Sequence, residues 1–343
     1  MQTLRPSVEQ FVAAHHGHYH PPMRFPWLAR LLGTAPSDGR SRAPVSPVIA
    51  RDFPDPDVVV VDGAYYAYST NSGYAGNLAH LPVQRADALT GPWTEVGDGF
   101  PELPGWVAED PPHVWAPELA RGSGGGYLLY FTARHARHQV QCIGVASSES
   151  PVGPFHSAAP DALLCRPEEG DTIDAESFVA ADGGRYLLYK SGRQYSSMWL
   201  QPMTSDGTAP EGERVELLRS DRPEEAGIVE APTLVQRGDS YILFYSANTF
   251  DSGQYHVNYA VASSLTGPYT KADGALLTTD TIDGAYLNPG HQDVVATADG
   301  DCLVFHASIS RTERGMFVAG LDWDADNRPS VVLTRPVDPA VRA

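Results

Sequence analysis

The chain has 343 residues and a mass of 37.0 kDa, and 42% of its residues are hydrophobic. This composition supports a large core and excludes global disorder. Its 42 acidic and 24 basic residues give a net charge of −18, which repels phosphate backbones, so we expect no nucleic-acid partner. No run of 18 apolar residues exists, so we expect no membrane partner. The 32 glycines and 29 prolines favour short strands joined by many turns.

Residues 1–45 differ from the rest of the chain. They hold His15, His16, His18 and His20, followed by a Pro/Ser/Arg-rich stretch. A metal-binding histidine tract is one interpretation. Because no neighbouring cysteine or carboxylate completes a site, we instead predict a partly irregular N-terminal arm. The first residues lack the continuous apolar core of a signal peptide, which favours the cytoplasm over secretion.

The three cysteines are Cys142, Cys165 and Cys302. Their number is odd, their spacing is wide and no CxxC pair exists. The pattern therefore indicates neither a zinc ribbon nor a disulfide framework.

An internal repeat begins after residue 50. Five segments share one strand pattern, GAYYAYST, GGYLLYFT, GRYLLYKS, DSYILFYS and GDCLVFHA, and each follows a turn that contains Gly or Asp. Their equivalent residues Tyr65, Tyr127, Tyr186, Tyr241 and Cys302 recur every 55 to 62 residues. A second element, TGPW, VGPF or TGPY, follows three of them. A β-sandwich would not explain this spacing, so we predict an all-β, five-bladed β-propeller of four-stranded blades over residues 46–343.

Five ionisable residues precede these strands at nearly one phase. They are Asp55, Glu118, Asp174, Glu230 and His291, each 9 to 12 residues before its repeat's reference residue. Because the inner strands of a propeller line its channel, residues at one phase should converge near the axis. A cluster of carboxylates suits glycoside hydrolysis, which needs one protonated acid and one carboxylate that activates water. The alternative is that these residues cap turns on the outer rim.

The motifs FPDPDVV, WAPE, IDAESF, VEAP and PGHQDVV occur in this order over residues 48–335. Together they resemble the family 43 glycoside hydrolases, five-bladed propellers that act on arabinose- and xylose-containing glycans. The resemblance implies that Asp55 is the general base, Asp174 the residue that tunes its neighbour's pKa, and Glu230 the general acid. We expect Asp55 to be ionised, and Glu230 to have a raised pKa and to keep its proton.

The resemblance also implies that His291 faces an axial calcium ion or a water cluster. Calcium prefers oxygen ligands, so any ion there should be mostly water-coordinated, with His291 as one protein contact. No cofactor is required by this chemistry, and a structural calcium in the channel is an option.

Four further residues are candidates for sugar binding. Trp115 could stack on a sugar face, or pack in the core instead. Phe53, two residues before Asp55, could form a wall of the pocket. Glu118 stands where many relatives have Asp. Arg311 could reach a sugar hydroxyl, as could Arg314, although both could be solvated loop residues.

We therefore expect a monomeric inverting glycosidase that releases L-arabinofuranosyl units from arabinan, arabinoxylan or arabino-oligosaccharides. A β-xylosidase is the alternative within the class, and an endo-acting arabinanase is the third. From another class, a non-catalytic propeller that binds sugars or proteins would have no need of all three carboxylates.

Overall fold

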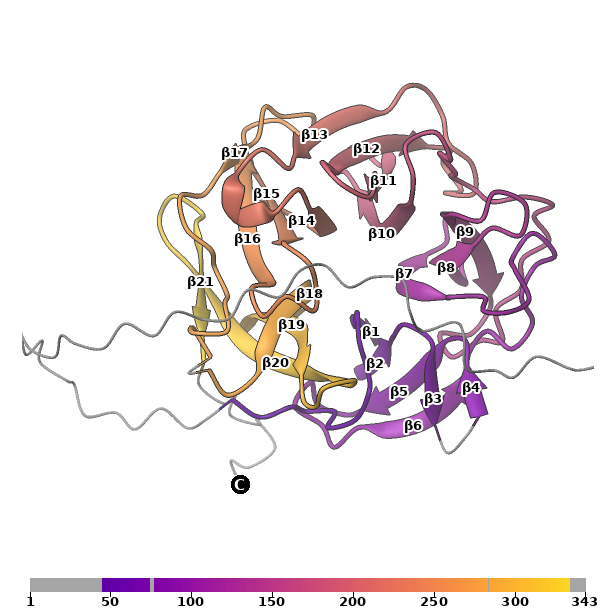
Figure 1. Ribbon diagram of the computed structural model, residues 1–343, viewed down its shortest axis with the longest axis horizontal. Helices are drawn as coiled ribbons and strands as arrows, with labels where there is room; N and C mark the ends of the chain where they lie inside the picture. The colour runs from indigo at the N-terminus through magenta and orange to yellow at the C-terminus, as the bar shows by residue number, and fades with distance from the viewer. Residues whose placement is uncertain (1–44, 75–76, 283, 334–343) are drawn as a thin grey trace, which may run out of the picture. The chain divides into compact units, whose positions relative to one another are not determined.

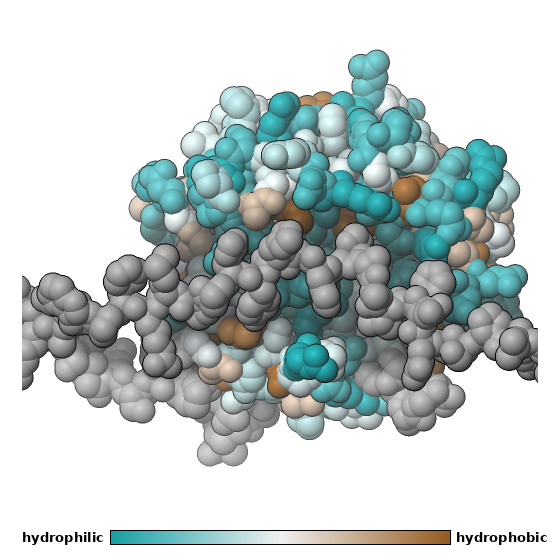
Figure 2. All heavy atoms as spheres, in the orientation of Figure 1, coloured by the Kyte–Doolittle hydropathy of each residue, from teal (hydrophilic) through white to brown (hydrophobic). Residues whose placement is uncertain are grey.

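The computed structural model describes residues 45–74, 77–282 and 284–333. The predicted arm, apart from residue 45, lies outside the described residues. The described part forms sheets around a central axis, each running outward from an inner strand (Figure 1). Its surface in Figure 2 is largely hydrophilic. Within these ranges, no helix has both the length and the apolar character needed to cross a membrane.

Successive strands within each sheet are antiparallel, and five sheets form five blades. Blade 1 contains β1 (Asp57–Val61), β2 (Ala64–Tyr68), β5 (Pro82–Ala86) and β6 (Thr94–Asp98), beside a small hairpin of β3 (Ser72–Tyr74) and β4 (Asn77–Ala79). Blade 2 contains β7 (Trp115–Arg121), β8 (Tyr127–Arg134) and β9 (Gln141–Ser148). Blade 3 contains β10 (Thr172–Val179), β11 (Arg185–Ser191), β12 (Ser197–Met203) and β13 (Val215–Arg219). Blade 4 contains β14 (Val229–Arg237), β15 (Ser240–Ala247), β16 (His256–Ala262) and β17 (Thr270–Lys271), preceded by the 3-10 turn η1 (Pro223–Glu225). Blade 5 contains β18 (Leu287–Thr297), β19 (Gly300–Ser308), β20 (Arg314–Trp323) and β21 (Pro329–Val332).

The five-bladed propeller is confirmed, and the repeated sequence segments are the second strands β2, β8, β11, β15 and β19. These strands are mostly apolar because both of their faces pack against neighbouring blades. The buried residues form five hydrophobic clusters, one between each pair of adjacent blades, including blades 5 and 1. The ring is therefore closed by hydrophobic packing on every side.

The N-terminal end of the described chain completes this closure. The backbone N–H of Val48 donates to Met316 of β20, and the N–H of Phe53 donates to the carbonyl of Arg314. Ile49 also forms a bridge with Met316. The first and last blades are thus joined by backbone hydrogen bonds as well as by apolar contacts.

Blade 2 differs from the predicted four strands, because its sheet has three. The following segment makes only isolated bridges to β9, between Ser147 and His156 and between Ile143 and Leu164. It therefore covers the edge of β9 without forming a continuous ladder, which still protects that edge from pairing with another chain.

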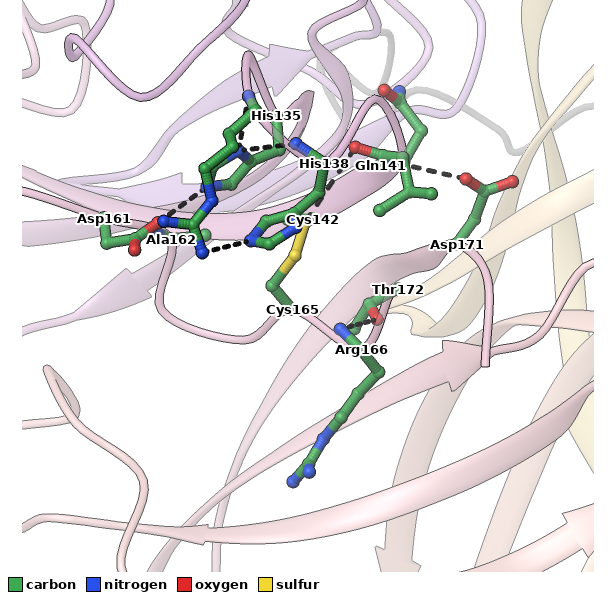
Figure 3. The surroundings of a disulfide bond; sticks show 12 residues. His135, His138, Gln141, Cys142, Asp161, Ala162, Cys165, Arg166, Asp171 and Thr172 are labelled. Atoms are coloured by element: carbon green, nitrogen blue, oxygen red, sulfur yellow. Dashed lines mark hydrogen bonds and ion pairs between the residues drawn. A yellow bond between two sulfur atoms is a disulfide. The ribbon is translucent and has the colours of Figure 1, made fainter. Parts of the chain in front are cut away.

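A disulfide between Cys142 and Cys165 fixes this segment to β9 (Figure 3). The expectation of no disulfide was wrong, because the irregular segment brings back a cysteine that is 23 residues away in sequence. Asp171, just before β10, accepts a hydrogen bond from the backbone N–H of Gln141. The disulfide thus lies within the connection between blades 2 and 3, while Cys302 remains a buried free thiol.

Removing this disulfide should lower the free energy of unfolding by about 3 kcal/mol, because it closes a loop of moderate length in the unfolded chain. Denaturant unfolding of a Cys142→Ala/Cys165→Ala variant measures this change. A reductant should destabilise the wild-type protein and leave the double variant unaffected. Equal stability of the two proteins without reductant would contradict the prediction.

Candidate active site

Each blade has a residue in the left-handed backbone region at an equivalent position, near the N-terminal end of its inner strand or, in blade 1, two residues before it. The inner strand β18 contains a second left-handed residue, Asn288, with φ of 56°. The residues at the equivalent position, here called bulge residues, are Asp55, Ala116, Asp174, Ala231 and His291, with φ between 44° and 59°. In the last four, the register of pairing with the second strand shifts at or next to this residue. A non-glycine residue in this region is strained, so each bulge needs specific partners to persist.

The partners come from the preceding blade. Four of the bulge residues donate their backbone N–H to a side chain at or near the end of a second strand. With the donor first, the pairs are Asp55 and His306, Ala116 and Thr70, Asp174 and Thr132, and His291 and Ser246. The fifth donates differently, from Ala231 to the Oδ2 of Asp174 at 2.9 Å. Every bulge is therefore fixed by a side chain from the blade before it.

A second ring of side chains lies two residues further along the inner strands. Its members, here called belt residues, are Asp57, Glu118, Glu176, Thr233 and Asp293. Each belt side chain forms a hydrogen bond with the backbone of the next inner strand. The four carboxyl groups of Asp57, Glu118, Glu176 and Asp293 accept from the backbone N–H groups of Leu119, Ser177, Leu234 and Val58, respectively. The Thr233 hydroxyl instead donates to the carbonyl of Gln292. The space among them and the bulges is about 20 Å³, enough for roughly one water molecule.

This arrangement corrects the prediction for Glu118. It is a belt residue, equivalent to Asp57 and not to Asp55, and its carboxylate bonds the Ser177 N–H in the channel. Counting residues from the repeated strands placed it two positions out of phase. Its carboxylate therefore links two inner strands, while its contact with sugar stays a prediction.

Asp55 is surrounded by positive and hydrogen-bonding groups. Its Oδ1 lies 2.9 Å from Nη1 of Arg314 and 3.3 Å from Nδ1 of His291, and its Oδ2 accepts a hydrogen bond from the Thr70 hydroxyl. Burial would raise the pKa of Asp55, but Arg314, His291 and His306 together hold it well below its usual range. Asp55 is therefore a carboxylate at neutral pH, as predicted, although side chains and not backbone N–H groups stabilise its charge.

Glu230 has two close partners. Oε2 accepts a hydrogen bond from the Lys190 ammonium at 2.7 Å, and Oε1 accepts one from the Tyr255 hydroxyl at 2.8 Å. Burial alone would raise the pKa of Glu230, but these partners outweigh it and the pKa lies below its ordinary value. The predicted raised pKa of Glu230 was wrong, because a buried lysine supplies the opposite charge.

Asp174 lies beside Glu230, since its Oδ2 accepts the N–H of the next residue, Ala231. Burial, assisted by the negative charge of Glu230, raises its pKa to about 6, against the opposing effects of His291 and Lys190. In the free protein the proton of this pair of acids therefore resides mainly on Asp174.

The other predicted sugar contacts divide into three cases. Trp115 precedes its bulge residue, as Glu230 does in blade 4, and is partly buried. Its ring lies nearly perpendicular to that of His113, with 5.1 Å between the ring centroids. Phe53 is fully buried in the cluster between blades 5 and 1, so it is a core residue and not a pocket wall. Arg311 is exposed in the loop between β19 and β20 and makes no hydrogen bond or ion pair to a described residue, whereas Arg314 reaches Asp55.

Sequence reasoning did not identify Lys190, Tyr255 or His306. Lys190 had a detectable signal, because it interrupts an otherwise buried strand in YLLYKS, and a lysine is rarely fully buried without a partner. Tyr255 lies in the loop before β16 and carried no comparable signal.

The expected water-coordinated calcium near His291 stays a prediction. His291 contacts Asp55, and the belt carboxylates already accept backbone N–H groups. Over the described ranges, no three His, Cys, Asp or Glu side chains form a metal-ligand set. No step below is assigned to calcium.

A five-bladed propeller that gathers a charged carboxylate and a coupled pair of acids at one end meets the chemical requirements of a glycoside hydrolase. Residues 45–329 match the family model "Glycosyl hydrolases family 43", so the chain belongs to this family.

Named relatives agree with this assignment. The chain is 27% identical over 268 residues to a "Probable arabinan endo-1,5-alpha-L-arabinosidase C" of Aspergillus flavus, covering 71% of this chain and 78% of that protein. It is 26% identical to the "Extracellular endo-alpha-(1->5)-L-arabinanase 1" of Bacillus subtilis, covering 79% and 85%. The crystal structure of "a thermostable family-43 glycoside hydrolase" superposes with a TM-score of 0.73 at 26% identity, covering 87% of this chain and 98% of that one.

The belt carboxylates make stability depend on pH. Burial and the neighbouring acids raise the pKa of Asp57, Glu118 and Glu176 well above the ordinary range, and burial raises that of Asp293 to about 6. A raised pKa means that the folded state binds the proton more tightly than the unfolded state does, so protonation stabilises the fold. This contribution to the free energy of unfolding is complete below about pH 4 and is lost as the pH rises through the pKa of the folded state. Asp55 and Glu230, whose pKa is lowered, act oppositely and lose their contribution in strong acid.

We therefore expect the melting temperature to be highest at mildly acidic pH and to fall as the pH rises through about 6 and beyond. Glu118→Gln should flatten this fall, because glutamine still accepts the Ser177 N–H but does not titrate. Calorimetry across this range tests the prediction, with the exposed Glu102→Gln as control. An unchanged slope in Glu118→Gln would contradict it.

Proposed function

We propose that this protein is an inverting glycoside hydrolase that releases L-arabinofuranosyl units from arabinan, arabinoxylan or arabino-oligosaccharides. The observation that carries the proposal is the contrast between Asp55, held as a carboxylate by Arg314, and Asp174, whose pKa is raised by burial and by the charge of the neighbouring Glu230. Inversion needs one group that takes a proton from water and another that gives one to the leaving oxygen. The three inner-strand ends supply both.

Asp55 acts as the general base. It lies in blade 1, whereas Glu230 lies in blade 4, and these blades are not neighbours in the ring. A water between Asp55 and the anomeric carbon would attack from the face opposite the leaving group. We expect their carboxyl groups to be about 6.5–9.5 Å apart, the separation that leaves room for this water.

Glu230 acts as the general acid and takes its proton from the pair that it forms with Asp174. Two interacting acids titrate as a unit, so the form with one shared proton is the active one. In the free protein Lys190 favours the ionised Glu230. We propose that the developing charge on the leaving oxygen draws the shared proton through Glu230, after which the ionised pair is stabilised by Lys190.

The two named relatives act on arabinan by their descriptions, which supports arabinan over xylan as the substrate. A β-xylosidase stays the alternative, because the same three carboxylates would serve a xyloside. The disulfide between Cys142 and Cys165 favours an oxidising compartment, where polysaccharide is found, over the cytoplasm suggested by the N-terminal residues.

Hydrolysis of nitrophenyl α-L-arabinofuranoside, compared with nitrophenyl β-D-xylopyranoside, tests the proposed activity. We expect the arabinofuranoside to be the better substrate, and proton NMR of the first-formed sugar to detect the β-anomer. Asp55→Ala should reduce kcat by about 10²- to 10⁴-fold, because no other group activates water. The exposed Asp299→Ala variant is the matched control. A retained α-anomer would refute the water-activating role of Asp55.

The pH dependence of kcat/KM separates the roles of Lys190 and Asp174. Wild-type activity should fall above about pH 6, where the shared proton is lost. Lys190→Met should move this fall in kcat/KM to a pH that is higher by roughly one unit or more, because the charge that favours ionised Glu230 is removed. Asp174→Asn should move it downward, because it leaves Glu230 with Lys190 and no neighbouring negative charge. Shifts in the same direction for both variants would contradict the shared-proton mechanism.

A further inference from the structure

The second partner of Glu230 is the phenol of Tyr255, in the loop before β16. Its hydroxyl donates to Oε1 of Glu230 at 2.8 Å, while the Lys190 ammonium donates to Oε2 at 2.7 Å. Burial and the negative charge of Glu230 raise the pKa of Tyr255 well above its ordinary value. The hydroxyl therefore keeps its proton and is a neutral hydrogen-bond donor to the general acid.

The lysine alone does not fix the plane of the Glu230 carboxyl group. The last torsion of a glutamate side chain is broad, so the two oxygens can turn about the Cγ–Cδ bond at little cost. An ammonium is a compact charge with three rotatable donors, and it imposes no plane on the group that it binds. A second donor on the other oxygen removes this freedom, and Tyr255 supplies it.

The ring of Tyr255 is itself held in one place. It is almost fully buried, and it lies within 9° of parallel to the imidazole of His306, with 5.9 Å between the ring centroids. This separation is typical of offset aromatic pairs. The ring also lies against Gly290, where an added Cβ would be 2.0 Å from the ring atom Cε1. Only a residue without a side chain leaves room for the tyrosine there.

His306 connects this arrangement to the general base. Burial lowers the pKa of His306 to about 4, so the imidazole is neutral, and its Nδ1 accepts the backbone N–H of Asp55 at 3.1 Å. The same imidazole thus holds the bulge that carries the base and packs against the tyrosine that holds the acid. Proton transfer depends on such fixed geometry, because small displacements of the reacting groups reduce the rate strongly.

We propose that Tyr255 is a positioning residue that orients the Glu230 carboxyl group for proton transfer to the leaving oxygen, and that Gly290 provides the space for its ring. The inference rests on the proposed function and adds two residues to it. Because Tyr255 acts through Glu230, it serves protonation of the leaving group, whereas activation of water by Asp55 does not require its hydroxyl.

Tyr255→Phe tests this role, because it removes the hydroxyl and keeps the ring on His306. The substrates are phenyl α-L-arabinofuranoside, whose poor leaving group needs a proton, and the dinitrophenyl analogue, whose leaving group needs little protonation. We expect kcat/KM on the phenyl substrate to fall by roughly 10-fold, as for the loss of one hydrogen bond to a charged group. On the dinitrophenyl substrate it should stay within about 2-fold of the wild type.

The matched control is Tyr259→Phe on β16. The Tyr259 ring packs near Phe244, and its hydroxyl makes no hydrogen bond to a described residue. This variant should leave both substrates unchanged.

Gly290→Ala tests the space for the ring. The added methyl group displaces the phenol, so we expect a loss of kcat/KM on the phenyl substrate at least as large as in Tyr255→Phe. In the Tyr255→Phe background the same substitution should add little to this selective loss, because the hydroxyl is already absent. Fully additive losses would overturn the role given to Gly290.

The outcomes are distinguishable. A loss in Tyr255→Phe that is confined to the poor leaving group supports the positioning role. If both substrates are affected equally, or neither is affected, the role is refuted while the proposed function stands. If the wild-type protein hydrolyses neither arabinoside, the proposed function itself fails. Melting temperatures of all variants show whether an equal loss on both substrates reflects a damaged fold.

Discussion

The strained bulge at the start of each inner strand is the constraint on which the rest of the site depends. A left-handed conformation costs of the order of 1–3 kcal/mol per non-glycine residue, and five such residues surround one axis. Each is held by a side chain from the preceding blade, and blade 5 holds the bulge of blade 1 through His306 and the N–H of Asp55. The catalytic geometry therefore exists only in the closed ring, which explains why apolar clusters and backbone bonds seal every junction between blades.

The bulge also explains how one strand carries two carboxylates with opposite behaviour. Asp55 and Asp57 are two residues apart and both are buried. Asp55 faces Arg314, which keeps its pKa low. Asp57 is buried beside the like charge of Asp293, and these two effects raise its pKa. The first is suited to taking a proton from water. The second holds neighbouring inner strands together through the Leu119 N–H.

The repeats were sufficient to predict the five blades and the strand ends at which Asp55, Asp174 and Glu230 lie. They were insufficient wherever the outcome depended on a bulge or on a distant partner. Glu118 was placed in the wrong ring because residue counts do not register the extra residue of a bulge. The predicted charge state of Glu230 was the opposite of the one that its contacts favour, because its partner Lys190 lies 40 residues away in the sequence. The disulfide was missed because nothing local indicated that the segment after β9 returns to it.

Departure from the five-fold pattern in blade 3 is what creates the acid pair. The residue that pairs with the position before the bulge is Thr132 in blade 2, Ser246 in blade 4 and His306 in blade 5, and each bonds the bulge N–H of the next blade. In blade 3 this residue is Lys190, which has no acceptor to offer and instead bonds the Glu230 carboxylate. The Ala231 N–H is then left to Asp174, the bulge residue of blade 3 itself. One substitution in the repeat therefore accounts for both contacts: it places a cation on Glu230, and it draws a second carboxylate to within reach of the same acid.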